Sequence, residues 1–528
     1  MRLYRLILIV FITQFGFANA QREQSRNSVN ADSGNKKQLA LEKATQVQQP
    51  FKLLFSGQQD LVNAWGKLHI SVTPVDTINA NVPSSDMSRP SATGIPESRV
   101  VGCFPKADGS WEVFSQEFTK VSEGAPGKWY EGTNRWKLLR GITSDGITFS
   151  NVETVIPDSI GTWTSHLTMA YNPDAGEYLM LKIRNGSYGF AYYAFFSNDG
   201  KNWQKHIGTR AGGALFYEGD AMSVFWSPVL KRFVLVSKSL QPVKKHIIDH
   251  GGSPKLLNDP TMIARRVLMM RSSPDGRNWT PSDDLPDIYD LHNQKAAHPV
   301  EWLTVPDGND PPDLEFYSGT AFWYHDRAYM MVLNYAASPM FPKKHGEELD
   351  NEWWTSTDGL SWDRPARGVN ALASFMNGNK RINMGPMNIG GKLLWLNANR
   401  LEGLPEDRIS GVSARANGEF STKTFTMPNG DLLLNAAIPS PDRPWVRRNP
   451  QPYLMVEVRD SQGNIIPGYE RGKCVIWDGT TSPNRNSQVD VTNKPLLWSG
   501  VSASKLTGQT ISLRFYFGGS TIYAVTAK

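Results

Sequence analysis

The chain has 528 residues, of which 40% are hydrophobic, 11% aromatic and 20% charged, and its formal net charge is +6. This is an ordinary globular composition, and the length exceeds what one compact domain usually contains, so we expect two domains and a tail. The positive charge is spread along the chain without a basic stripe. This distribution argues against nucleic-acid binding, and it would suit an anionic glycan.

The first 20 residues have the features of a secretory signal peptide. Arg2 and Arg5 precede an apolar run from Leu6 to Phe17, and a small-x-small cleavage site follows at Ala18-Asn19-Ala20. No later stretch approaches the roughly 20 apolar residues of a membrane span. We therefore expect the mature protein to be exported, either to the periplasm or out of the cell, with no membrane span.

Residues 21–50 are rich in Gln, Asn, Ser and Lys, and they have too few large apolar groups to order themselves. They predict a disordered leader. The chain contains only two cysteines, Cys103 and Cys474, which excludes a disulfide framework and a cysteine metal site. The sequence leaves a disulfide between these two residues open, but it favours two unpaired thiols.

A short pattern of Ser, Asp-Gly and a following aromatic residue recurs four times. The four copies contain Asp145-Gly146, Asp199-Gly200, Asp275-Gly276 and Asp358-Gly359. Asp-Gly between strand-like runs is a strong hairpin signal, because Gly adopts positive φ at little cost and Asp bonds to its own backbone. Copies spaced by roughly one blade plus insertions predict a repeat architecture, the β-propeller.

The strand-like runs predict an all-β protein, a five-bladed β-propeller followed by a C-terminal β-sandwich. We assign the propeller to residues 51–430. Its fifth blade is predicted from Leu393–Asn397, Ile409–Ala414 and Phe420–Phe425. Alternating apolar and polar residues between turns predict the antiparallel β-sandwich over residues 431–528.

Candidate catalytic residues lie just before the predicted innermost strand of each blade, because these positions line the axial mouth of a propeller. They are Asp220, Glu315, Glu131 and His166. Glycoside hydrolysis needs two carboxyl groups, about 5–5.5 Å apart for retention or about 6.5–9.5 Å apart for inversion. Asp220 and Glu315 precede strands of adjacent blades and form the predicted pair. One would stay ionised, and a raised pKa would let the other act as the acid.

Candidate substrate-binding residues occupy the same kind of position. They are Trp163, Tyr317, Arg184, Arg381 and Glu218. The chain has 17 Trp residues, and aromatic faces stack on sugar rings, although most of these side chains are expected to pack blades together. For each carboxylate the structural alternative is a surface turn or an arginine partner, and for His166 it is a satisfied core histidine. No metal site is predicted.

Several motifs resemble those of secreted bacterial proteins similar to glycoside hydrolase families 32 and 43. They are Asp220–Pro228 followed by Lys231-Arg232-Phe233, Glu315-Phe316-Tyr317, the turn Asp358–Arg364, and the C-terminal runs Asn429–Asn435 and Val456–Val458. The resemblance covers about residue 214 to the end. It implies a five-bladed propeller, a carbohydrate substrate, no cofactor, and in some members a structural calcium ion in the axial channel.

The resemblance also implies an acidic triad, with Asp220 as the stabilising Asp and Glu315 as the acid. No blade-one Asp matches the third member, so Glu131 and His166 are the candidate bases, and Ser227 stands where the related pattern often has Asp. The leading prediction is a secreted glycoside hydrolase acting on an oligo- or polysaccharide. The alternatives are a non-catalytic carbohydrate-binding propeller and a sialidase-like enzyme that uses Arg184, Arg271 and Tyr317. The sequence predicts no oligomeric state.

Overall fold

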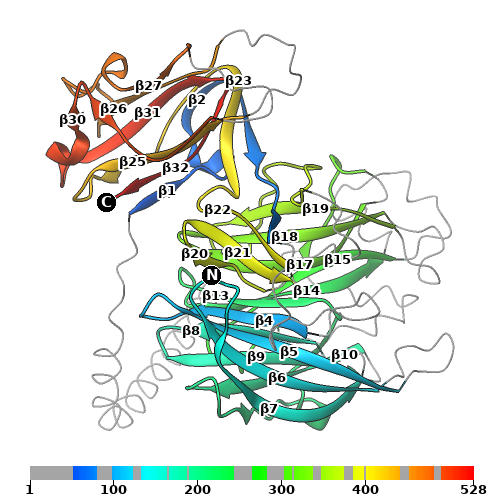
Figure 1. Ribbon diagram of the computed structural model, residues 1–528. Helices are drawn as coiled ribbons and strands as arrows, with labels where there is room; N and C mark the ends of the chain where they lie inside the picture. Colours follow the sequence, from blue (N-terminus) through cyan, green and yellow to red (C-terminus); the bar gives the residue numbers. More distant parts are fainter. Residues whose placement is uncertain are drawn as a thin grey trace, which may run out of the picture. The chain divides into compact units, whose positions relative to one another are not determined.

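A computed structural model shows a protein built almost entirely of β-strands (Figure 1). It describes residues 51–79, 98–122, 133–162, 166–186, 189–242, 264–281, 303–311, 314–336, 347–373, 384–397, 400–439, 451–480 and 489–528. The predicted signal peptide and leader lie outside these residues. Within them, no helix has both the length and the apolar character needed to cross a membrane.

Five antiparallel sheets form a five-bladed β-propeller, as predicted (Figure 1). The first strands of successive sheets contact one another, β4 with β8, β8 with β13 and β13 with β17, which makes them the innermost strands. Blade one contains β4 (Ser98–Pro105), β5 (Trp111–Ser122), β6 (Thr133–Thr143) and β7 (Ser150–Thr162). Blade two contains β8 (Leu167–Asn172), β9 (Glu177–Gly186), β10 (Gly189–Ser197) and β11 (Gln204–Lys205), and β12 (Tyr217–Glu218) pairs with β10. Blade three contains β13 (Met222–Ser227), β14 (Arg232–Pro242), β15 (Ala264–Ser273) and β16 (Leu303–Thr304), and blade four contains β17 (Leu314–Tyr324), β18 (Arg327–Ala336) and β19 (Glu347–Ser356).

Blade five is built from both ends of the propeller sequence. Its sheet runs β20 (Met387–Ile389), β21 (Lys392–Asn397), β22 (Arg400–Pro405) and then β3 (Asp76–Asn79), which precedes blade one in the chain. The pairing of Leu401 with Asn79 and of Gly403 with Asp76 closes the ring. The prediction for this blade was therefore wrong for Ile409–Ala414 and Phe420–Phe425, because hydrogen bonds place both segments against strands of another sheet.

The four Asp-Gly turns share one hydrogen-bond pattern and follow the third strand of blades one to four. In the turn after β10, Ser197 Oγ donates to Asp199 Oδ1 at 2.9 Å, and the same oxygen accepts from the N–H groups of Lys201 and Asn202. In the first turn the hydroxyl comes from Thr143 rather than Ser144. The repeat thus arises from local side-chain chemistry, which explains why the sequence reveals it.

The glycine of each turn lies against the preceding blade. Gly200 has φ of +70°, and a Cβ there would lie 2.9 Å from Phe114 of blade one. Gly359 has φ of +92°, and a Cβ there would lie 2.8 Å from Phe225 of blade three. Both positions therefore require glycine for conformation and for close approach, so the same turn also packs neighbouring blades together.

The remaining strands form a ten-stranded sheet that combines the C-terminal region with two N-terminal strands (Figure 1). Its strands are β1 (Lys52–Leu54), β2 (Val62–Val72), β23 (Ser410–Ser421), β24 (Phe425–Thr426), β25 (Leu432–Ile438), β26 (Tyr453–Asp460), β27 (Val475–Asp478), β28 (Val489–Pro495), β31 (Thr510–Gly518) and β32 (Ser520–Ala527). Short elements beside them are the hairpin β29 (Leu497–Trp498) and β30 (Val501–Ser502) and the 3-10 turns η1 (Gln58–Asp60), η6 (Arg471–Lys473) and η7 (Ala503–Leu506); η3 (Ala211–Gly213) lies in blade two.

Strand β23 joins the two parts of this sheet, because residues 412–414 pair with β32 and residues 418–421 pair with β31. Apolar residues from both parts meet in one buried cluster, which includes Leu434, Val456 and Phe515. The predicted domain boundaries at residues 51 and 431 therefore differ from the sheet membership, since β1, β2 and β23 pair here rather than in a blade. Cys103 and Cys474 are free thiols.

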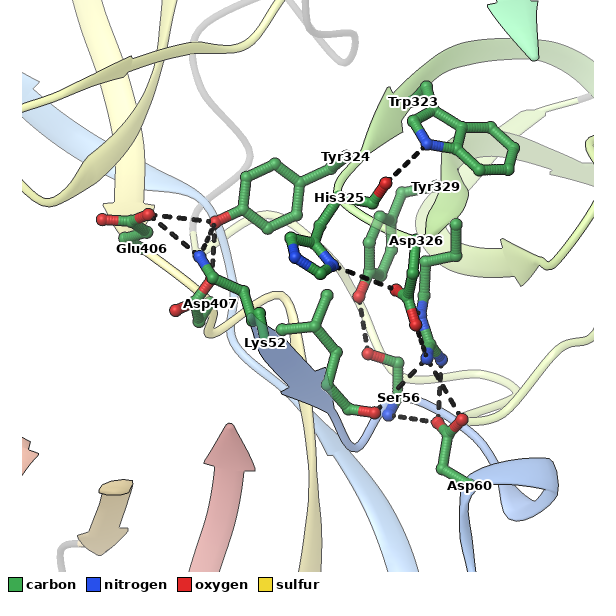
Figure 2. A network of polar contacts seen from close by, with 12 residues as sticks. Lys52, Ser56, Asp60, Trp323, Tyr324, His325, Asp326, Tyr329, Glu406 and Asp407 are labelled. Carbon is green, nitrogen blue, oxygen red and sulfur yellow. Dashed lines mark hydrogen bonds and ion pairs between the residues drawn. The ribbon is translucent and has the colours of Figure 1, made fainter. Parts of the chain in front are cut away.

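A polar network ties the segment around β1 to the β17–β18 turn of blade four (Figure 2). The Arg327 side chain, 4% exposed, donates to Asp60 at 2.8 and 3.1 Å and to the carbonyl oxygen of Leu54 at 3.3 Å. Ser56 Oγ lies 2.5 Å from the hydroxyl of Tyr329. The propeller and the ten-stranded sheet are therefore joined by buried charges as well as by the chain.

A second part of this network is centred on Lys52 of β1 (Figure 2). Lys52 Nζ donates to Asp407 at 2.6 Å, to Glu406 at 3.1 Å and to the hydroxyl of Tyr324 at 3.2 Å. Burial and the two neighbouring carboxylates raise the pKa of Tyr324 above its usual range. The hydroxyl thus stays protonated and donates to Asp407 at 2.5 Å.

Candidate functional site

The topology defines the end of the propeller at which the predicted site residues lie. In each blade the innermost strand begins, and the antiparallel second strand ends, at the same edge of the sheet. We call this edge the mouth end. The Asp-Gly turns follow the third strands and lie at the opposite end.

Glu315, the predicted acid, is the second residue of β17 and is completely buried. Its carboxylate accepts from the backbone N–H of Arg266 at 3.1 Å and from the Arg266 guanidinium at 2.5 Å. The Arg266 guanidinium also lies over the rings of Tyr317 and Tyr335. These two rings stack on each other with their centres 4.5 Å apart. Glu315 therefore orients Arg266 in this arrangement and has no exposed oxygen to offer a substrate.

Asp220, the predicted stabilising carboxylate, precedes β13 and forms an ion pair with Lys238 of β14. The Asp220 side chain is 27% exposed, and that of Lys238 is 14% exposed. Burial lowers the pKa of Lys238, but Asp220 and Tyr317 outweigh it, so the net shift is upward. Lys238 Nζ also lies 4.6 Å from the centre of the Tyr317 ring. An ammonium group held in its charged form stabilises the ionised form of Asp220.

The structure thus places Asp220, Glu315 and Tyr317 in one group with two cations, Lys238 and Arg266, that the sequence analysis did not select. We call the set Asp220, Lys238, Arg266, Glu315 and Tyr317 the mouth cluster. Lys238 follows the apolar run Phe233–Val236 of β14, and Arg266 directly precedes the apolar run Val267–Met270 of β15. A charge beside such a run is the signal that could have identified each cation, but it does not reveal which carboxylate the cation would meet.

Glu218 and Arg271 form a second buried ion pair close to this cluster. Arg271 Nε and Nη2 donate to Glu218 Oε2 at 3.0 and 2.8 Å, and both side chains are 0% exposed. The guanidinium also donates to the carbonyl oxygen of Pro281 and lies 4.4 Å from the Phe216 ring centre. Arg271 is therefore committed to holding the fold, which removes it from the arginine triad that the sialidase-like reading requires.

His166, a candidate base, lies at the mouth end of blade two, immediately before β8. Arg99 Nη1 lies 3.0 Å from His166 Nδ1. A guanidinium only donates, so Nδ1 accepts, the ring is neutral, and its proton is on Nε2. In this form His166 can donate to a hydroxyl or an anion, which fits binding better than proton abstraction.

Three predicted site residues, Glu131, Trp163 and Arg381, lie outside the described residues. Arg184, on β9, is exposed. The described part of the chain contains no group of three or more His, Cys, Asp or Glu side chains placed to hold a metal ion.

Lys182, two residues before Arg184 on β9, is a further cation that the sequence analysis did not select. Its Nζ lies 4.4 Å from the centre of the Trp136 ring of blade one. Burial, Arg184 and Lys205 together lower the pKa of Lys182 to about 8. Unlike the cations of the mouth cluster, Lys182 has no carboxylate partner among the described residues.

No protein-family model and no curated protein matches the chain. Among solved structures, it is similar to a glycosyl hydrolase from Bacteroides ovatus, with 12% identity over 64% of this chain and 96% of the other and a TM-score of 0.39. It is also similar to a fructofuranosidase from Schwanniomyces occidentalis (9% identity, 87% and 99% covered, TM-score 0.34). A GH32 beta-fructofuranosidase from Bombyx mori is 10% identical, with 82% and 93% covered and a TM-score of 0.32. The roles of the residues in this chain rest on their own geometry.

Proposed function

We propose that the protein hydrolyses glycosidic bonds of an oligo- or polysaccharide at the mouth end of blades three and four. The observation that carries this proposal is the convergence of Asp220 and Glu315, from the entries of adjacent blades, on one group of cations and stacked tyrosines. Hydrolysis of this kind needs an ionised carboxylate near the sugar ring, and Asp220 is partly exposed and paired with an ammonium group.

In this proposal Asp220 is the ionised carboxylate that acts as base or stabilises the oxocarbenium-like transition state. Glu315 is a positioning residue, because it holds Arg266 against the stacked Tyr317 and Tyr335. A general acid must come within hydrogen-bond reach of the glycosidic oxygen, and a fully buried carboxylate does not. Glu315 is therefore not assigned as the acid, and Glu131 keeps its role as a candidate base. The Nε2–H group of His166 binds a sugar hydroxyl.

Export belongs to the same proposal. The apolar run and cleavage site in residues 1–20 support secretion, and an extracellular or periplasmic location suits an enzyme that acts on polysaccharides. Fractionation of cells expressing the full chain tests this, and a product that keeps residues 1–20 and stays in the cytoplasm would refute it.

The decisive experiment is a screen of the mature protein against polysaccharides and aryl glycosides, with new reducing ends and product masses as the readout. We expect Asp220→Asn to reduce turnover by about a thousandfold, in the range reported when a catalytic charge is removed. The control is Glu153→Gln, which removes a partly exposed carboxylate from a pair with Arg140 away from the mouth cluster. Full turnover in Asp220→Asn would end the assignment.

The second candidate is a carbohydrate-binding propeller without catalysis. It is favoured by one specific observation: each of the predicted site carboxylates that the structure describes, Glu218, Asp220 and Glu315, has a basic partner. Binding of an oligosaccharide in calorimetry, with no product after long incubation and no dependence on Asp220, would support this candidate over the hydrolase.

A further inference from the structure

The face of blade two that lies toward blade one carries a group of cations that have no counter-charge among the described residues. Lys182 and Arg184 lie on β9 and Lys205 on β11, beside Tyr193 of β10 and Trp136 of β6. We call these five residues the Lys182 cluster. Lys182 pairs across the ladder with Leu167, the first residue of the innermost strand β8, so the cluster reaches the mouth end.

Neither Lys182 nor Arg184 has a hydrogen-bond or ion-pair partner among the described residues. Lys205 Nζ has one long hydrogen bond, to the carbonyl oxygen of Gly212 at 3.4 Å, and lies 4.8 Å from the Tyr193 ring centre. Burial and the like charges of Arg184 and Lys205 disfavour the charged form of Lys182.

A third, independent feature is an unsatisfied donor beside the same cations. The Trp136 side chain is 3% exposed, and its indole N–H has no acceptor among the described residues. A buried donor without an acceptor costs about 1–3 kcal/mol, a cost that an added acceptor would offset. The cluster therefore offers three positive charges with no carboxylate partner in the described part of the chain, and the carbonyl oxygen of Gly212 is the acceptor of one of them, Lys205.

We propose that the Lys182 cluster binds the anionic group, a carboxylate or a sulfate, of an acidic saccharide. This inference rests on the proposed function and makes its substrate an acidic glycan. An anion there would supply the counter-charge that Lys182 and Arg184 lack. The mouth cluster lies at the same end of the propeller, so a glycan chain that crosses the mouth would place its charged group in blade two and its scissile bond at blades three and four.

The test compares three galactose-based oligosaccharides by calorimetry with the mature protein: oligogalacturonate, a κ-carrageenan oligosaccharide, and a neutral β-1,4-galactan oligosaccharide. Oligogalacturonate carries only carboxylates and carrageenan only sulfates, so these two separate the possible anions. We expect at least one acidic probe to bind about ten- to a hundredfold more tightly than the neutral one, the value of one charge-assisted contact. Equal affinity for all three, or no binding of either acidic probe, would overturn the inference.

Variants of the cluster residues test whether the acidic probe binds at the Lys182 cluster. Arg184→Gln and Lys182→Met should each lower the affinity for the acidic probe about tenfold or more. Lys392→Gln removes an exposed cation at the opposite end of blade five and is the matched control. An equal loss in Lys392→Gln would show that net charge alone attracts the probe. Arg184 is exposed and has no partner in the part of the chain that the structure describes, so its variant should fold normally and keep the test interpretable.

A pH series gives a readout that general charge attraction does not. Between about pH 7 and about pH 9.5, wild-type affinity for the acidic probe should fall as Lys182 loses its proton, whereas Lys182→Arg should stay constant. Parallel curves would overturn the role of Lys182.

Asp220→Asn should bind the acidic probe normally without turnover. Turnover of neutral glycans alone would refute this inference and leave the hydrolase, whereas acid-specific binding without turnover would refute the hydrolase alone.

Discussion

Two lysines at the mouth end of the propeller show what a counter-charge does. Lys238 in blade three and Lys182 in blade two both lie on the second strand of their blade and over an aromatic ring, at 4.6 and 4.4 Å from its centre. Burial lowers the pKa of both. Asp220 reverses the shift for Lys238, whereas Arg184 and Lys205 add to it for Lys182. Lys238 forms an ion pair within the protein, whereas Lys182 has no carboxylate partner among the described residues and could bind an anionic ligand.

This difference separates structural from functional charge in the same propeller. The buried pairs Glu315–Arg266 and Glu218–Arg271 satisfy their charges internally, so their loss should be felt mainly as instability. In the Lys182 cluster, positive charges lie close together without a carboxylate partner among the described residues, and this arrangement lowers the stability of the fold. Strongly shifted groups of this kind occur often at functional sites.

The largest expected effect on stability comes from Glu315→Gln, which removes the carboxylate from the buried ion pair with Arg266. The change leaves the Arg266 guanidinium, 3% exposed, without its counter-charge. We expect the free energy of unfolding to fall by about 3–5 kcal/mol, as for other buried pairs that lose one partner. Urea unfolding followed by tryptophan fluorescence measures it. The double variant Glu315→Gln/Arg266→Met should recover part of the loss, and a single variant as stable as wild type would contradict this account of the pair.

Lys182→Met should have the opposite sign. The unfolded-state pKa of lysine is about 10.4, whereas the folded value is about 8, so the unfolded chain binds more protons between these values. The free energy of unfolding of the wild type should therefore rise as Lys182 loses its proton between about pH 8 and about pH 10.4. Below about pH 8 Lys182 is charged in the folded protein, and its full destabilising effect remains. The variant should be more stable at pH 7, by on the order of 2 kcal/mol, and should lack this rise.

Unfolding curves for wild type and Lys182→Met at pH 7 and at about pH 9.5 check this prediction, since the difference between the two proteins isolates one lysine. Lys182→Arg is the control, because its charge persists at both values. A variant less stable than wild type at pH 7 would show that Lys182 has a favourable partner and would remove the contrast with Lys238.

The sequence predicted the blades because their signal is local. Each Asp-Gly turn is built from a hydroxyl, an aspartate and a glycine within four residues, so the pattern is visible without knowing any neighbour. The ring closure by β3 was missed because it pairs Asn79 with Leu401, and nothing local in either segment identifies the other. The same reason explains why β1 and β2 were assigned to the propeller.

For the candidate site, the sequence indicates positions but not environments. Position at the start of an innermost strand selected Asp220 and Glu315, which the structure places in the mouth cluster. Position could not tell that Glu315 would be buried under Arg266 while Asp220 remains partly exposed, because burial depends on the side chains that neighbouring blades contribute. Charges with partners on other strands, such as Lys238, are therefore recognisable only in the folded chain.

A smaller effect on stability is expected for Asp220→Asn. The pair with Lys238 is partly exposed, and water compensates the ammonium that is left behind, so the free energy of unfolding should fall by about 1 kcal/mol or less. Glu315→Gln, measured beside it by the same urea titration, is the reference for a buried pair. Equal losses in the two variants would show that exposure does not distinguish these carboxylates, and the choice of Asp220 as the substrate-facing group would lose its basis.

Arg184→Gln should leave stability unchanged, within about 0.5 kcal/mol, because an exposed side chain without a partner contributes little to the fold. It is the sharpest test of the contrast between the two lysines, since the same change should weaken binding of an acidic oligosaccharide. Removing Arg184 also removes one of the like charges beside Lys182, so the pKa of Lys182 should move back toward its ordinary value. The pH at which stability begins to rise should then shift upward from about 8, whereas an unshifted onset would show that burial alone sets the pKa of Lys182.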